Sequence, residues 1–167
     1  MTVGVDKIKA LLSHVFLYKM FMPEYEESLG AHLWFVSTIF QIYIIFYILI
    51  KVRNKFGRNK FLMSCSILSV VWWIVVALLD FSDMRVWNSF FLQYIWEFAM
   101  GMYVAETYME KGKLFIDNIK TSYLVCITGV GIIIYGLMAL SDAGLKVFND
   151  VFSVMAFGGA VTLIYID

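Results

Sequence analysis

Long apolar stretches constrain this chain more than any other feature of its sequence. Residues 33–50, 61–79 and 123–140 contain no charged side chain. Each stretch is long enough to cross the roughly 30 Å of bilayer hydrocarbon as a helix, because an α-helix rises about 1.5 Å per residue. The chain is 62% hydrophobic and only 16% charged, which is more apolar surface than a soluble domain of 167 residues can bury. The sequence therefore predicts an integral membrane protein.

Two further stretches have the length of a crossing but carry polar residues. Residues 86–105 contain Gln93 and Glu97, and residues 147–166 contain Asn149 and Asp150 near their start. The single proline and the absence of short alternating segments favour helices over a transmembrane barrel. We therefore expect an all-α polytopic membrane helix bundle with about five transmembrane helices. It forms a single membrane-embedded region over residues 1–167, with an amphipathic N-terminal segment within residues 1–30.

Basic residues are concentrated after the first apolar stretch. This predicted loop contains Lys51, Arg53, Lys55, Arg58 and Lys60. Short loops rich in Lys and Arg stay on the cytoplasmic side, so we expect the N-terminus outside and the C-terminus inside. One interpretation is that the basic residues set the topology and contact anionic lipid. The other is that they bind a polyphosphate cofactor.

A polar face interrupts the first apolar stretch. At about 100° per residue, Trp34, Ser37, Thr38 and Gln41 share one side of the helix, and Tyr43 lies opposite. A glutamine in lipid needs a hydrogen-bonding partner from another helix or from water. The face therefore either holds helices together or lines a substrate cavity.

Glu97 lies near the middle of its predicted span, where an ionised carboxylate costs on the order of 3 kcal/mol. It should face the bundle interior, and Gln93 and Tyr94 share its side of the helix. Both a functional role and a structural hydrogen-bonding role are compatible with this position. Later in the chain, Gly158 and Gly159 lie between alanines and predict close helix packing.

Other chemistries lack support in the sequence. The formal net charge is zero, which does not indicate nucleic-acid binding. His14, His32 and the two dispersed cysteines lack zinc-ligand spacing, and no glycine-rich phosphate loop follows a strand. We therefore expect neither a metal site nor a resident cofactor.

Two sequence blocks point to a family. The run HLWFVSTIFQIYIIFYILI over residues 32–50 resembles the "LWFLS…QFYLLFPLL" signature of membrane acyltransferase family 3, with Trp34, Phe35, Ser37, Gln41 and Tyr43 matching. The later run EFAMGMYVAE resembles the family's "EFLLGMLLA"-like block, in the same order and spacing. The acidic residue that many bacterial members carry four places after the signature tryptophan is absent.

The resemblance implies an O-acyltransferase of the type that modifies polysaccharide or lipopolysaccharide. It would lie in the bacterial inner membrane and transfer an acyl group, typically acetyl from acetyl-CoA as donor substrate, to a glycan or lipid-linked sugar. On this interpretation Trp34, Ser37, Gln41, Gln93, Tyr94 and Glu97 line the cavity and position the substrates. The family's Arg-rich motif and following histidine, which imply the general base, have no counterpart here. This predicts a central or C-terminal fragment whose partner is a missing N-terminal half, and which is catalytically incompetent alone.

Two alternatives use the same residues without acyl transfer. In a multi-pass membrane scaffold, the polar side chains only hold helices together. In a small transporter, Glu97 serves as the intramembrane acid.

Overall fold

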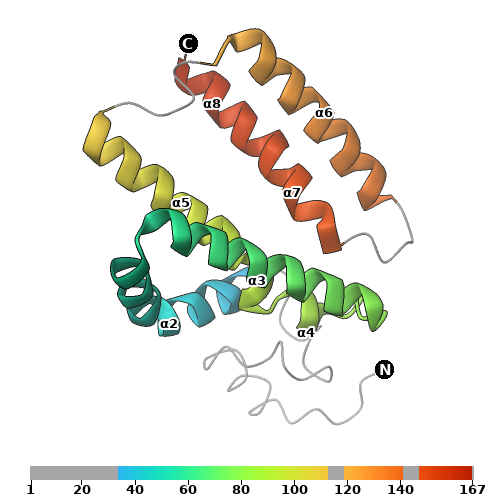
Figure 1. Cartoon of the computed structure of the whole chain (residues 1–167). Helices are drawn as coiled ribbons and strands as arrows, with labels where there is room; N and C mark the ends of the chain where they lie inside the picture. The colour runs from blue at the N-terminus through green and yellow to red at the C-terminus, as the bar shows by residue number, and fades with distance from the viewer. Residues whose placement is uncertain (1–33, 113–118, 141–146, 167) are drawn as a thin grey trace. The chain divides into compact units, whose positions relative to one another are not determined.

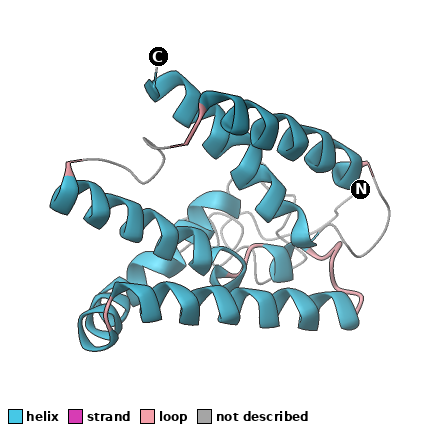
Figure 2. Ribbon diagram, turned by 45° about the horizontal axis from the view of Figure 1, so that its top comes forward, coloured by secondary structure: helices cyan, strands magenta, loops and turns pink. Residues whose placement is uncertain are grey.

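The computed structural model describes residues 34–112, 119–140 and 147–166, and this part of the chain is built from helices (Figures 1 and 2). In chain order the elements are α2 (Trp34–Phe56), α3 (Arg58–Leu78), α4 (Arg85–Asn88), α5 (Phe91–Lys111), α6 (Thr121–Ala139), α7 (Asn149–Ser153), a π-helical turn η6 (Val154–Gly158) and α8 (Gly159–Ile166). The all-α prediction is confirmed. The predicted amphipathic segment lies outside the described residues.

Within the described residues, three helices are long and apolar enough to cross a membrane, namely α2, α3 and α6. Each of them contains most of one of the three uncharged stretches of the sequence. Many of their large apolar side chains are exposed, as at Leu78, which is 80% exposed. Such exposure is unfavourable in water but costs nothing against lipid tails, which are equally apolar. The prediction of a polytopic membrane bundle is confirmed for these helices.

The two polar-interrupted stretches are also helical, with different properties. Helix α5 has 21 residues, but its glutamine, glutamates and tyrosines leave it less apolar than the three spans. The apolar helix over Asn149–Ile164 is shorter than the other three. That these two segments cross the bilayer stays a prediction.

Two boundaries differ from the expectation. The predicted helix over residues 86–105 is interrupted between Asn88 and Phe91, so α4 and α5 are separate elements. The predicted basic loop is also wrong, because α2 continues to Phe56 and α3 begins at Arg58. Gly57 alone joins them, with a φ of 82° that glycine adopts without a steric penalty. Its N–H donates to the Arg53 carbonyl at 2.8 Å and closes the end of α2.

The chain divides into two compact units. The first comprises Met1–Ile74 with Asp83–Met100, and its described part holds α2, most of α3, α4 and the first half of α5. The second comprises Val75–Ser82 with Gly101–Asp167, where α6 runs antiparallel to the continuous α7–η6–α8 helix (Figures 1 and 2). The expectation of one acyltransferase-like region stays a prediction.

Glycines set the closest approach of the helices in the second unit. A Cβ on Gly131 would lie 2.7 Å from the Ala156 backbone nitrogen and 2.9 Å from the Met155 Cβ. A Cβ on Gly159 would overlap Oγ1 of Thr128. Of the small residues predicted for helix packing, Gly159 and Ala156 pack closely against α6, whereas Gly158 is exposed.

The packing at Gly131 has a matched test on the same helix. Gly131→Ala should destabilise the protein by about 1–3 kcal/mol relative to Gly129→Ala, because the new methyl group must displace backbone atoms of the facing helix. A Cβ at Gly129 meets nothing within 4 Å, so both variants gain the same helix propensity and only one creates an overlap. Unfolding in detergent micelles measures the difference. Equal stability of the two variants would contradict the packing.

Candidate functional site

The start of α5 is held by side chains from the polar face of α2. Nε2 of Gln41 donates to the Ser89 carbonyl at 3.3 Å, and its Oε1 accepts from the Phe91 backbone N–H at 3.2 Å. The Thr38 hydroxyl donates to the same Ser89 carbonyl at 2.8 Å. The first turn of a helix lacks internal partners for its N–H groups, so Gln41 caps α5 from a different helix. These contacts explain how the helix can be interrupted before α5 in an apolar environment, because side chains of α2 bond to the backbone groups that the interruption leaves without helical partners.

A hydroxyl from α3 contacts the next turn of α5. Ser69, which is fully buried, donates from Oγ to the Leu92 carbonyl at 2.8 Å and accepts from the Trp96 N–H at 3.3 Å. In a regular helix these two backbone groups bond to each other. One turn further along α3, the Trp73 indole N–H donates to the Gln93 carbonyl at 3.3 Å.

Aromatic rings surround these hydrogen bonds. The Trp34 and Tyr94 rings join α2 to α5, with centroids 5.9 Å apart. Trp72 stacks on Trp87 with centroids 5.3 Å apart, and its indole N–H donates to the Trp87 carbonyl at 3.2 Å. Tryptophan therefore serves here both as apolar packing and as a hydrogen-bond donor to helix ends.

Within the first unit, α2 and α3 contact the segment where α4 ends and α5 begins, and we call this region the α4–α5 junction. Most of the predicted site residues lie there. Ser37 and Gln93 are buried, and Trp34, Gln41 and Tyr94 are half-buried. Glu97 follows Gln93 by one turn of α5, is half-buried and interacts with a neighbouring group. The exposed position of Tyr43 agrees with the predicted polar face. Gln41 holds helices together, and the cavity-lining role of these residues stays a prediction.

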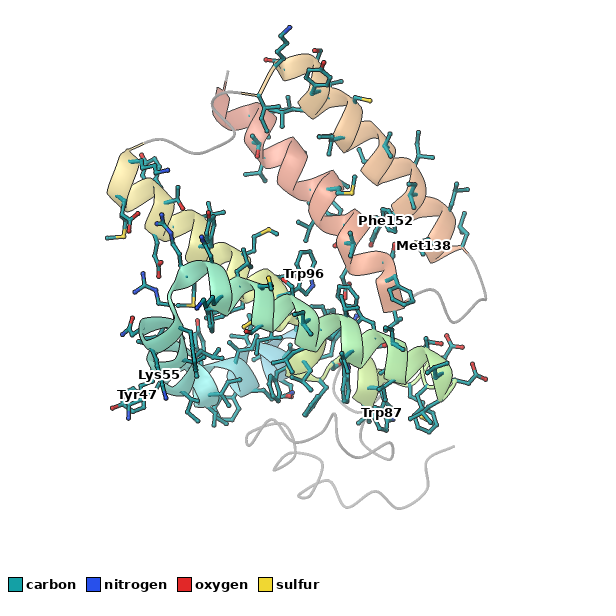
Figure 3. The ribbon with its side chains drawn as sticks, in the orientation of Figure 1. Tyr47, Lys55, Trp87, Trp96, Met138 and Phe152 are labelled. Atoms are coloured by element: carbon teal, nitrogen blue, oxygen red, sulfur yellow. The ribbon has the colours of Figure 1, made fainter. Side chains whose placement is uncertain are left out.

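Three residues of the junction were not among the candidates from sequence. Ser69 and Trp73 lie in an uncharged span. A serine is tolerated in an apolar helix at little energetic cost and a tryptophan is expected to pack as an apolar residue, so neither one indicated a site. Ser89 was expected inside a continuous helix. Its Oγ and the indole nitrogen of Trp96 (labelled in Figure 3) are buried and have no hydrogen-bond partner among the described residues.

The part of the chain that the structure describes contains no cluster of side chains suited to bind a metal ion. No group of three or more His, Cys, Asp or Glu side chains there could hold a metal ion. Cys65 and Cys126 are both free thiols.

The fold and the junction define a helical membrane protein whose polar residues are gathered between apolar helices. Comparison with known families then identifies its kind: the family model described as an acyltransferase domain matches residues 9–166. The chain belongs to this family, membrane acyltransferase family 3, as the resemblance of its two sequence blocks predicted. No curated protein and no solved structure matches the chain.

The Ser69 contact is testable with a second serine on the same helix. Ser69→Ala should destabilise the protein by about 1–2 kcal/mol, because it removes a buried hydroxyl that serves two backbone groups of α5. Ser64→Ala is the control, since Ser64 is exposed on α3. Thermal unfolding in one detergent, followed by circular dichroism, compares the two. A Ser69→Ala variant as stable as Ser64→Ala would show that the contact contributes nothing.

Proposed function

We propose that this chain is part of an integral-membrane O-acyltransferase that moves an acyl group, acetyl being the simplest, from a CoA thioester to a hydroxyl of a glycan or lipid-linked sugar. The observation that carries the proposal is the family match over nearly the whole chain. The buried polar junction supports it, because polar residues kept within lipid usually serve a pathway or a reaction. The bacterial inner membrane is the proposed location.

The reaction needs two substrates aligned and one proton removed. The acceptor oxygen bonds to the thioester carbonyl carbon, the carbon–sulfur bond breaks, and CoA leaves as a thiol with the acceptor's proton. Positioning is the role that we assign to the junction. Gln41 fixes the first turn of α5, and the Trp34 and Tyr94 rings offer half-buried apolar faces. The general base is not assigned to any described residue.

Glu97 is the strongest candidate for direct contact with a substrate. It is a half-buried acid on α5, directly after Trp96, whose N–H bonds to Ser69. It also lies one turn after Gln93, whose carbonyl accepts from Trp73. A group held on such a fixed helix keeps its geometry as substrates bind, which is the requirement for efficient positioning.

A scaffold without catalysis is the second candidate, and one observation favours it. Thr38, Gln41 and Ser69 all bond to the backbone of the α4–α5 segment, which is what helix-joining residues do. An activity measurement separates the two candidates.

The acyltransferase proposal predicts the behaviour of two glutamate variants on one helix. Glu97→Gln should lower acyl transfer by on the order of tenfold to a hundredfold while leaving membrane insertion unchanged, because it keeps shape and hydrogen bonding but removes the acid. Glu110→Gln, at the exposed end of α5, should leave transfer unchanged. The assay follows labelled acetyl-CoA into glycan in liposomes.

That assay has outcomes that count against the proposal. Full transfer by Glu97→Gln, together with loss of folding in Glu97→Leu, would make this residue structural. The chain is assayed alone and together with the product of the DNA immediately upstream, since the family's Arg-and-His motif is expected there. No transfer in either preparation, with both folded, would favour the scaffold.

The proposed topology places the turn at Gly57, between α2 and α3, in the cytoplasm. In a variant without native cysteines, Asn59→Cys should react with an impermeant thiol reagent only from the cytoplasmic side. Met84→Cys should react only from the outside, because it follows the far end of α3 and is 53% exposed. The reverse pattern would overturn the orientation, and with it the cytoplasmic access for the CoA donor.

A further inference from the structure

One exposed stripe on α2 is not explained by the junction. Tyr43, Tyr47, Lys51 and Lys55 follow one another at intervals of four residues, which places neighbours on the same side of a helix. The two tyrosines are 66% and 67% exposed, and both lysines are exposed. Tyr47 and Lys55, both labelled in Figure 3, project from α2. The stripe runs from the apolar part of the helix to its charged end.

The cations in this stripe lie beside aromatic rings. Nζ of Lys51 is 4.3 Å from the centroid of the Tyr47 ring, and Nζ of Lys55 is 5.4 Å from that of Phe56. Both distances are within the range of cation–π attraction. An ammonium in this arrangement keeps donors for a further anion while its aliphatic stem covers apolar surface.

The lysines of the stripe lie where α2 is expected to enter the lipid headgroup layer. The uncharged part of α2 ends at Ile50, and Lys51 starts the charged end of the helix. Because Gly57 alone joins α2 to α3, both helices leave the hydrocarbon on the same side. The lysines therefore lie at the depth of lipid phosphates, with the tyrosines one and two turns deeper.

Charge is one-sided across both helices. Residues 34–79 contain five basic residues, all between Lys51 and Lys60, and no aspartate or glutamate. A dense positive cluster at the end of a span attracts anionic headgroups. A soluble anion would explain the lysines alone, whereas a phospholipid explains the lysines together with the exposed rings beneath them.

We propose that this stripe is a binding site for an anionic phospholipid. The lipid phosphate bonds to Lys51 and Lys55, and the acyl chain lies along the rings of Tyr47 and Tyr43. The site is separate from the α4–α5 junction and does not depend on the proposed enzymatic function.

Native mass spectrometry tests this site on the purified full chain, with phosphatidylglycerol and phosphatidylcholine as probes. The unmodified chain should retain phosphatidylglycerol preferentially, and more so at low salt. The double variant Lys51→Gln, Lys55→Gln should bind it on the order of tenfold more weakly. The control Lys111→Gln, Lys120→Gln removes the same charge elsewhere and should bind like the unmodified chain.

Other outcomes overturn the proposal. Equal retention of the two lipids by the unmodified chain, a measurement that needs no variant, would exclude a selective site. Equal phosphatidylglycerol binding by the two double variants would place the site elsewhere. Unchanged lipid binding by Tyr47→Leu, with complete displacement of lipid by pyrophosphate, would show a soluble-anion site. Dissociation of a dimer in the Lys51→Gln, Lys55→Gln variant would show that a second copy covers the stripe.

Discussion

The need to pair every backbone polar group without water governs this molecule. In hydrocarbon a continuous helix meets that need alone, so α2, α3 and α6 require only apolar side chains. An interruption requires outside partners. Between α4 and α5 those partners are Thr38 and Gln41 on α2, which serve the Ser89 carbonyl and the Phe91 N–H. The polar face of α2 and the interruption before α5 therefore depend on each other.

The contacts at the α4–α5 junction also fix the direction of α5. Ser69 and Trp73 on α3 contact the next turn of α5, so two helices fix the direction of a third through hydrogen bonds as well as packing. Glu97 follows on that fixed turn. For a membrane acyltransferase, such an arrangement keeps an acidic group in one place while substrates bind. Joining helices and positioning substrates can thus be two consequences of the same contacts.

Much of the fold could be predicted because hydropathy acts locally. The uncharged stretches predicted α2, α3 and α6, and the spacing of Ser37 and Gln41 predicted the face of α2 that is turned inward. The family was also predictable, since two motif blocks carry it. Residue spacing could not show that the basic segment is helical up to Gly57, because lysine and arginine are good helix formers that also occur in loops.

By itself, the sequence determined that the chain is helical, membrane-embedded and an acyltransferase family member, because composition, apolar length and motif order need no partner. Only the tertiary structure decided where the helix before α5 is interrupted and which side chains serve it. A serine such as Ser69 has the same low cost anywhere in an apolar helix, so its sequence position carries no signal. Its role arises when α3 brings the hydroxyl within 2.8 Å of the Leu92 carbonyl, a contact set by packing between distant segments.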